Sequence, residues 1–308
     1  MTVHRYSLLV VLALGALSCT KKPPPNKTPP AASVASPPAD TSLPMKTRRG
    51  GMDVTFAVVS DTHFGFDGIE KDNARLIERV NALGGRDYPP KIGGHVGNIR
   101  GLAITGDLTE WGREDEWASF VAAYGLTGTE SRLKVPVFEM IGNHDKVALG
   151  PWLGDQVGAR HGGRFYSWDW DDLHLVALGE APDDASLAFL TKDLAHVAPD
   201  VPVILLFHLA LLGPWSTDNW FDDTYKERLR KTIEGHFVAA IFHGHHHATG
   251  HYTWNGIDVW KPGAVKNGAH TIAVVHATDF TWTLASYDWD KEQWASTFEK
   301  PLAARPAK

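Results

Sequence analysis

The sequence predicts an α/β (α+β) fold, a double β-sheet sandwich flanked by helices. Three observations lead to this prediction. From about Met52 onward, apolar runs typical of strands alternate with helical patterns, as in layered α and β architectures. A further group of short strands meets at tight polar turns. The 308 residues are 43% apolar and 10% aromatic, which supplies a sizeable core.

Four segments have the apolar spacing of amphipathic helices. In the first, Leu76, Ile77 and Val80 lie at helical spacing, and Gly84 follows as a terminator. Gly235 ends the last segment in the same way. The predicted helices cover residues 72–83, 114–124, 185–194 and 225–234.

A group of short strands predicts hairpins. Asn255-Gly256 is a strong hairpin signal because both residues tolerate positive φ. We expect these hairpins to form a second sheet, within one domain over residues 51–300 that leaves 301–308 as a tail. The strands of this group are predicted at 164–169, 173–178, 251–254, 257–260, 271–276 and 281–288.

The N-terminus has the features of a secretory signal over residues 1–19. Its apolar stretch, residues 8–17, is too short to span a bilayer. Ala16-Leu17-Ser18-Cys19 resembles the lipobox of bacterial lipoproteins. Residues 20–50 are rich in Pro, Ala, Ser, Thr and Lys, which predicts a disordered tether. We therefore expect an exported protein, anchored to a membrane of the cell envelope through lipidated Cys19 and facing the periplasm or the exterior.

Charge and cysteine content exclude some partners and sites. The net charge is -6 and no basic stripe stands out, so nucleic acid is not an expected partner. Cys19 is the only cysteine, so the mature domain has no disulfide or thiolate metal site. Any metal must be bound by nitrogen and oxygen ligands. The sequence leaves the oligomeric state open.

Five apolar runs end abruptly in residues of the metal-binding type. The carboxyl ends of short buried strands lie along one edge of a sheet, so the side chains that follow them can converge on a pair of cations. The five motifs are Asp61-Thr62-His63, Gly106-Asp107, Gly142-Asn143-His144-Asp145, His208, and Gly244-His245-His246-His247.

The donor types in these motifs suit two metal ions. Asp61 and His63 are two residues apart, so in an extended segment they share a face. Asp107 has two carboxylate oxygens and could bridge two cations roughly 3.5 to 4 Å apart. An oxygen of Asn143 and the imidazoles of His208, His245 and His247 complete a mixed set. Such a set suits Mn, Fe, Zn or Ni better than calcium.

In this order, the five motifs resemble those of the calcineurin-like metallophosphoesterase superfamily, whose fold is a double β-sandwich flanked by helices. The resemblance implies that Asp61, His63 and His247 hold a first metal ion, that Asn143, His208 and His245 hold a second, and that Asp107 bridges them.

The resemblance also implies a catalytic role for His144, which would face the scissile phosphate and either protonate the leaving oxygen or stabilise its charge. The carboxylate of Glu110, three residues after Asp107, is the candidate that orients His144. The purple acid phosphatases have a tyrosine ligand at this point, and the phosphoprotein phosphatases have an arginine where this chain has Trp111. Both differences argue against those two branches.

The function expected from these residues is hydrolysis of a small phosphoester, monoester or diester, by a hydroxide that bridges two metal ions. One alternative is a phosphodiesterase for cyclic nucleotides or phospholipid head groups. Another is a non-catalytic envelope scaffold, which would have no need of His144. The aromatic segment 211–223 follows His208 and is a candidate wall of the substrate pocket.

Overall fold

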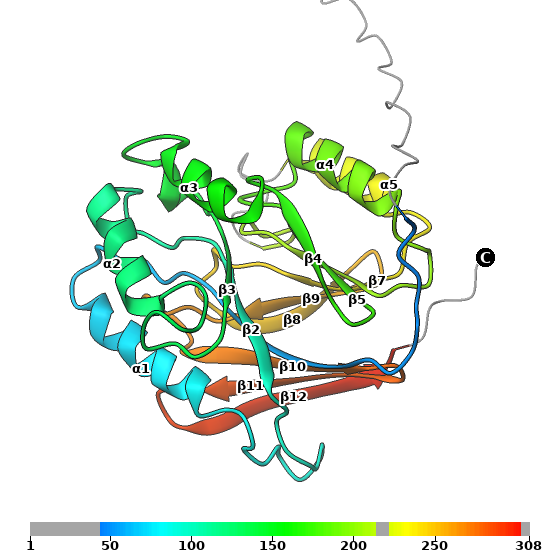
Figure 1. Cartoon of the computed structure of the whole chain (residues 1–308), viewed down its shortest axis with the longest axis horizontal. Coiled ribbons are helices and arrows are strands. Elements are labelled where there is room, and N and C mark those ends of the chain that lie inside the picture. Colours follow the sequence, from blue (N-terminus) through cyan, green and yellow to red (C-terminus); the bar gives the residue numbers. More distant parts are fainter. Residues whose placement is uncertain (1–43, 214–221, 303–308) are drawn as a thin grey trace, which may run out of the picture. The chain divides into compact units, whose positions relative to one another are not determined.

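The computed structural model describes residues 44–213 and 222–302 (Figure 1). The predicted signal peptide with Cys19, most of the predicted tether and the end of the predicted tail lie outside this part of the chain. Trp215 and Trp220 of the candidate pocket wall also lie outside it.

The first sheet of the described chain has six strands in the order β12-β11-β10-β1-β2-β3. The strands β1, β2 and β3 run parallel, and β10, β11 and β12 extend the sheet in antiparallel pairs. Their bounds are β1 Asp53–Val59, β2 Ile99–Thr105, β3 Val137–Met140, β10 Thr271–Thr278, β11 Thr281–Asp288 and β12 Gln293–Pro301.

The second sheet of the described chain also has six strands, in the order β4-β5-β6-β7-β9-β8. Its four inner strands are parallel, and the edge strands β4 and β8 pair antiparallel with their neighbours. Their bounds are β4 Tyr166–Trp170, β5 Leu173–Ala177, β6 Val203–Leu206, β7 Val238–Phe242, β8 Thr249–Trp254 and β9 Ile257–Pro262.

The two-sheet architecture is confirmed, but the predicted sheet membership of the hairpin strands is wrong. They do not form a sheet of their own: β10 and β11 join the first sheet, and β4, β5, β8 and β9 extend the second. A hairpin signal fixes only the neighbour with which a strand pairs. The sheet that a hairpin joins depends on distant contacts, such as the pairing of Val275 in β10 with Phe56 in β1.

Large aromatic side chains fill the space between the sheets. Phe56 on β1 lies 5.4 Å from Trp170 on β4, measured between ring centroids. Phe242 on β7 lies 6.4 Å from Trp282 on β11. These contacts join strands of different sheets, and all four residues are buried. The sheets therefore share one apolar core, which fixes the relative position of their strand ends.

Five α-helices of the described chain flank the sheets (Figure 1), and a short 3₁₀ helix, η1, spans His144–Lys146. Leu190 of α4 and Leu229 of α5 belong to the same apolar cluster as Leu205 of the second sheet. Four helices were predicted, with small shifts at their ends. The helix α3 was not, because Gly154 and Gly158 weaken its helical signal. The bounds are α1 Ile69–Asn81, α2 Glu114–Tyr124, α3 Trp152–His161, α4 Asp184–Leu194 and α5 Asp223–Thr232.

The last residues of the predicted tether contact the domain. The amide of Lys46 donates to the carbonyl of His196 at 2.7 Å, and its carbonyl accepts from the amide of Ala198 at 2.9 Å. The amides of Arg49 and Gly50 both donate to Asp172 at 2.7 Å. Residues 46, 49 and 50 thus form hydrogen bonds with the domain, although they precede the predicted boundary at residue 51. Among the residues described, no helix has the length and apolar character needed to cross a membrane.

Candidate metal centre

The structure brings all seven predicted metal ligands to one place, beyond the carboxyl ends of five parallel strands. The first sheet contributes the segments after β1, β2 and β3, and the second sheet contributes those after β6 and β7. Asp61 and His63 follow β1, Asp107 follows β2, Asn143 follows β3, His208 follows β6, and His245 and His247 follow β7.

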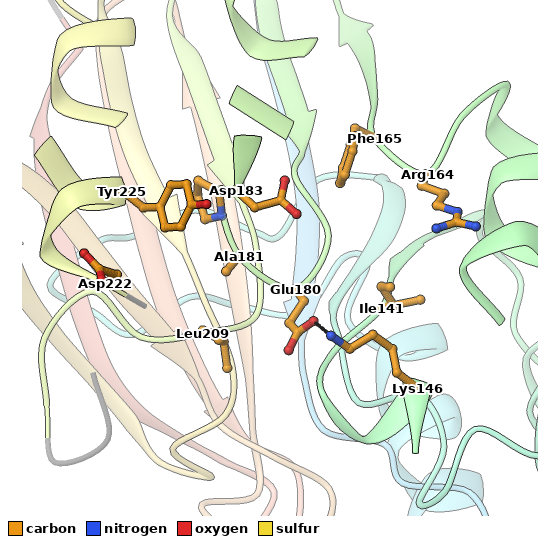
Figure 2. Close-up of a pocket in the computed structure, with 11 residues that line it drawn as sticks. Ile141, Lys146, Arg164, Phe165, Glu180, Ala181, Asp183, Leu209, Asp222 and Tyr225 are labelled. Atoms are coloured by element: carbon orange, nitrogen blue, oxygen red, sulfur yellow. Dashed lines mark ion pairs between the residues drawn. The ribbon is translucent and has the colours of Figure 1, made fainter. Parts of the chain in front are cut away.

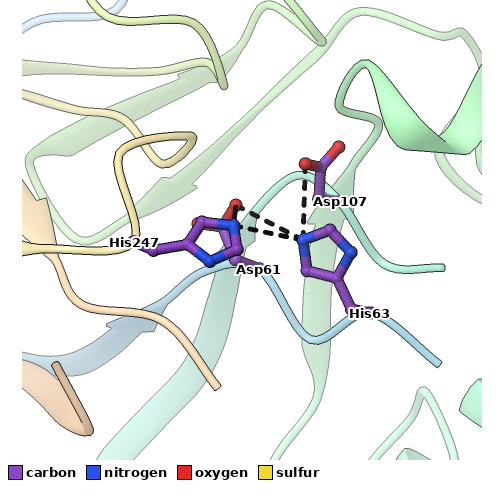
Figure 3. A group of neighbouring side chains, drawn as sticks. All are labelled: Asp61, His63, Asp107 and His247. Carbon is purple, nitrogen blue, oxygen red and sulfur yellow. Dashed lines mark hydrogen bonds and ion pairs between the residues drawn. The ribbon is translucent and has the colours of Figure 1, made fainter. Parts of the chain in front are cut away.

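Asp61, His63, Asp107 and His247 form a first group of donor atoms (Figure 3). The Nε2 atom of His247 lies 3.2 Å from Oδ1 of Asp61 and 3.3 Å from Nε2 of His63. The same His63 atom lies 3.5 Å from Oδ2 of Asp107. Two imidazole nitrogens and two carboxylates thus converge, a set that suits a divalent transition-metal ion.

A second group contains Asp107, His208 and His245. The Nε2 atom of His208 lies 3.1 Å from Oδ2 of Asp107 and 3.1 Å from Oδ1 of Asn143. The ring centroids of His208 and His245 are 5.2 Å apart. Asp107 belongs to both groups, which places its carboxylate where it can contact two ions.

The hydrogen bonds of His208 test whether this second group fits a cation. Its Nδ1 atom lies 2.8 Å from the carbonyl oxygen of Thr105, which can only accept, so Nδ1 carries a proton. The other nitrogen, Nε2, faces two oxygens, those of Asp107 and Asn143. Without a proton on Nε2, this nitrogen and the two oxygens are three acceptors in contact. Either a second proton on the His208 ring or a cation between the three atoms would compensate them. The donor set therefore fits a metal ion.

Charge at this centre is buried. Asp61, Asp107, His63 and His208 are all almost fully buried. Burial would raise the pKa of Asp61, but hydrogen bonds from His247 and His63 outweigh it and hold this pKa well below its ordinary value. Burial would lower the pKa of His208, but the charge of Asp107 and a hydrogen bond to it raise the pKa to about 10. The two carboxylates thus depend on positive charge around them, which protonated histidines or metal ions supply.

Backbone strain also concentrates here. Nine non-glycine residues of the described chain have positive φ, and more than half of them are predicted ligands. Such conformations cost about 1 kcal/mol or more, and they persist where the surrounding structure fixes them. Gly106 has φ +94°, and a Cβ atom there would lie 2.6 Å from Nδ1 of His208. The predicted ligands with positive φ are Asp61, His63, Asp107, His245 and His247.

The structure places His144 beside this centre but corrects the contact predicted for Glu110. The Nδ1 atom of His144 lies 2.8 Å from the backbone carbonyl oxygen of Glu110, not from its carboxylate. The carboxylate oxygen Oε2 instead lies 2.8 Å from Nδ1 of His63, and both carboxylate oxygens accept from Lys266. The reason is local: the segments 61–64 and 107–110 pair through backbone hydrogen bonds, which sets Glu110 beside His63.

A family model for calcineurin-like phosphoesterases matches residues 54–249. The chain belongs to this family. A curated relative, a probable cyclic nucleotide phosphodiesterase of Rhodopseudomonas palustris, is 27% identical over 246 residues that cover 71% of this chain and 79% of the relative. The resemblance predicted from the motifs is confirmed, and with the clustered ligands it identifies a metal-dependent phosphoesterase.

Two solved structures show the same fold at low sequence identity. A dimetal phosphatase of Danio rerio is 11% identical, has a TM-score of 0.58, and covers 82% of this phosphoesterase and 99% of its own chain. GAP50, the anchor in the inner membrane complex of Plasmodium, is also 11% identical, with a TM-score of 0.56 and coverages of 83% and 90%. These similarities show the double-sheet fold alone.

One residue of this phosphoesterase site, Asp145, had no predicted role although it follows His144 in its motif. It is buried and accepts four hydrogen bonds, from the amides of Leu108, Thr109 and Gly142 and the hydroxyl of Thr109, at 2.7 to 3.1 Å. Asp145 therefore ties the loop that carries Asp107 to the loop that carries His144. A carboxylate beside the ligand motif was the signal that could have revealed it.

A cavity of about 320 Å³ is lined by several residues that neighbour predicted ligands in the sequence (Figure 2). Ile141 and Lys146 flank the motif of Asn143 and His144, and Leu209 follows His208. Lys146 pairs with Glu180 in the cavity wall, as the dashed line in Figure 2 shows. Its lining combines apolar and aromatic side chains with charged ones, namely Ile141, Phe165, Leu209 and Tyr225 with Lys146, Arg164, Glu180, Asp183 and Asp222.

Proposed function

We propose that this phosphoesterase uses two metal ions to hydrolyse phosphodiesters, and that cyclic nucleotides are the first substrate class to test. The observation that carries the proposal is the convergence of seven donor side chains into two groups that share Asp107. The curated relative named as a probable cyclic nucleotide phosphodiesterase favours diesters over monoesters.

Asp61, His63 and His247 would hold the first ion, Asn143, His208 and His245 the second, with Asp107 between them. Bound there, the ions would polarise the phosphoryl oxygens and lower the pKa of an attacking water molecule. We infer Mn, Fe, Zn or Ni from the mixed nitrogen and oxygen donors.

His144 would act on the leaving group. The carbonyl oxygen of Glu110 accepts from Nδ1 of His144, so this nitrogen keeps its proton and the ring orientation is fixed. The remaining nitrogen, Nε2, is then the atom that gives a proton to the departing oxygen. The amide of His144 also donates to Oδ1 of Asp107 at 2.9 Å. This hydrogen bond links His144, the proposed general acid, to Asp107, the residue that both groups share.

The organic part of the substrate would occupy the cavity lined by Ile141, Lys146 and Leu209, which are close in sequence to Asn143 and His208. Phe165 and Tyr225 offer apolar ring faces, and the charged groups of the wall offer hydrogen bonds. If the cavity has this role, Tyr225→Ala raises KM for a cyclic nucleotide and leaves KM for a small diester such as dimethyl phosphate unchanged.

The experiment that tests the function compares substrates. The metal-free chain is loaded with Mn²⁺ and assayed with cyclic nucleotides, phospholipid head-group diesters and the corresponding monoesters. We expect higher kcat/KM for diesters than for monoesters, with cyclic nucleotides turned over. Faster hydrolysis of monoesters would contradict the diester assignment.

A non-catalytic scaffold is the competing function. The fold itself does not decide between the two, because a protein described as an anchor shares it at 11% identity. The seven donors and His144 favour catalysis here, since binding alone requires no leaving-group acid. Two bound ions without turnover of any ester would favour the scaffold.

We also propose that the chain acts at the cell envelope, attached through lipidated Cys19. The support is the sequence Ala16-Leu17-Ser18-Cys19 after an apolar stretch, followed by the Pro-rich residues 20–43. Membrane fractionation tests it: we expect the wild-type chain in the membrane fraction and Cys19→Ala outside it. The same distribution of both proteins between the membrane and soluble fractions would contradict the proposed lipid anchor.

A further inference from the structure

The loop between β9 and β10, residues 263–270, contacts the backbone of two first-group ligands. The amides of Val265 and Lys266 both donate to the carbonyl oxygen of Asp61 at 3.2 Å. The amide of Ala269 donates to the carbonyl oxygen of His247 at 3.2 Å. We call residues 263–270 the backing loop, because it lies behind these two ligands.

The third ligand of the first group, His63, is reached through side chains of the same loop. The ammonium group of Lys266 donates to both oxygens of Glu110, at 2.8 and 2.7 Å. Oε2 of Glu110 lies 2.8 Å from Nδ1 of His63. A chain of three charged or polar groups therefore runs from the backing loop to the metal centre.

This chain of contacts is shielded from water. The side chain of Lys266 is 13% exposed, that of Glu110 is 9% exposed and that of His63 is fully buried. The ring of Phe66 lies 4.6 Å from the Lys266 ammonium nitrogen and covers it. An ion pair held in this way is screened less than a surface pair.

A carboxylate on the second nitrogen of a metal-binding histidine has a defined effect. It fixes the proton on Nδ1, orients the ring and makes Nε2 a better donor to the metal. In this chain Nε2 of His63 is the atom that faces Asp61, Asp107 and His247. Without Lys266, the Glu110 carboxylate would lose the two hydrogen bonds that fix its position, so it would no longer be held beside Nδ1 of His63.

We propose that Glu110 and Lys266 are positioning residues that orient His63 and thereby set the affinity of the first metal site. Because Asp61 and His247 are held by the same loop, the backing loop acts on the first group. The second group is held from elsewhere, for instance by the carbonyl of Thr105 on His208. This inference rests on the proposed two-metal function and predicts that the two sites respond differently to substitution.

The test measures Mn²⁺ binding to the metal-free chain by isothermal titration calorimetry. We expect Lys266→Met and Glu110→Gln to weaken one of the two sites about 10- to 100-fold. The other site changes less than about threefold, within ordinary context effects. Lys266→Arg, which keeps a cation beside Glu110, restores most of the affinity. His247→Ala lacks a ligand of the first group, so the Mn²⁺ affinity that remains in this variant belongs to the second site. The site left unaffected by Lys266→Met should have that affinity.

Lys300→Met is the matched control. Lys300 is also a partly buried lysine, paired with Asp258 and the carbonyl of Ala239 away from the metal ligands. It should leave both affinities unchanged. Circular dichroism of each metal-free variant checks folding, and the Arg variant keeps the test valid if Lys266→Met does not fold.

Equal weakening of both sites, or no change at either, would overturn the role of Lys266 and Glu110. Failure of the proposed function looks different. In that case the wild-type chain itself binds fewer than two ions or hydrolyses no ester, whatever residue stands at position 266.

Discussion

At the scale of single residues, the centre combines buried charge with strained backbone. Asp61 and Asp107 are buried carboxylates with positive φ, and each depends on neighbouring histidines or a cation for compensation. Both features cost free energy in folding and are retained where a function uses them. The residues at this centre are therefore organised for ligand binding at the expense of stability.

The first prediction concerns His144 as the leaving-group acid. We expect His144→Ala to lower kcat about 10²- to 10⁴-fold for a cyclic nucleotide, whose leaving alkoxide needs a proton. A p-nitrophenyl diester should lose much less, because p-nitrophenolate leaves without protonation. Steady-state kinetics on both substrates decide the point, and equal losses would show that His144 does not donate the proton.

The second prediction concerns Asp145. In Asp145→Asn, an amide NH₂ replaces one oxygen that now accepts two hydrogen bonds. The buried amides of Leu108 and Gly142 would then face the NH₂ group of the new side chain, a donor in place of their acceptor. We therefore expect a loss of about 2 to 4 kcal/mol in the free energy of unfolding. Urea denaturation of the metal-free protein measures it. Asp290→Asn, which removes an exposed ion pair with Arg75, should cost less than about 1 kcal/mol.

The sequence was sufficient to predict which donor side chains come together, but not which side chains support them. The seven predicted ligands follow apolar strands, and strand ends meet at a sheet edge whatever the details of packing. The direction of the Glu110 side chain depends on the pairing of two loops, which has no sequence signature. Lys266 lies in a loop far along the chain with no motif, so only the structure reveals it.

At the scale of secondary-structure elements, a buried histidine joins the second sheet to its covering helix. His174 on β5 lies 2.7 Å from Asp169 on β4 and 2.7 Å from Asp193 on α4. Burial alone would lower the pKa of His174, but hydrogen bonds to Asp169 and Asp193 raise it to about 9. Lys46 faces Asp169 as well, and the nearby His236 has a lowered pKa, chiefly from burial.

The third prediction follows from this cluster. Because the pKa of His174 is higher in the folded than in the unfolded chain, its stabilisation is fully present below about pH 6.5. It disappears as the pH rises through about 9. The unfolding free energy of wild type should exceed that of His174→Gln, and this excess should be about 2 to 3 kcal/mol larger at pH 6 than at pH 9.5. The range allows for the exposure of Asp169, which weakens its interaction with His174. Denaturation in excess chelator measures this, and a pH-independent difference would refute it.

Element prediction succeeded where local patterns decide and failed where distant contacts do. The helix Glu114–Tyr124 was predicted with its observed bounds because its apolar face is clear in sequence. The assignment of β10 and β11 failed because β10 pairs with β1, at the other end of the domain, and thereby brings its neighbour β11 into the first sheet. The strand β12 was not predicted, since its side chains are mostly exposed and lack an apolar alternation.

At the scale of the whole domain, the metal centre joins two sheets. Asp61, Asp107 and Asn143 come from the first sheet, whereas His208, His245 and His247 come from the second. Metal ions held by both would link the sheets, since a ligand that binds only the folded state stabilises it. Metal binding and global stability should therefore change together.

The fourth prediction is a metal-dependent stability that Asp107 controls. With free Mn²⁺ at about 100 times Kd, we expect the folded state to gain about 2.7 kcal/mol per site, so chelation lowers Tm. Asp107→Ala removes the shared ligand and should lose more than half of this gain. Thermal unfolding with and without Mn²⁺ measures it, and an undiminished shift in the variant would mean that the ions bind elsewhere.

We infer that Asp107 joins two ions in one dinuclear centre, and X-ray absorption spectroscopy of the Mn²⁺-loaded chain can detect such a centre. We expect two ions per chain with a metal–metal distance of roughly 3.5 to 4 Å. In Asp107→Ala this metal–metal signal should disappear. A single bound ion, or two ions with no metal–metal scattering in the wild-type protein, would contradict the claim.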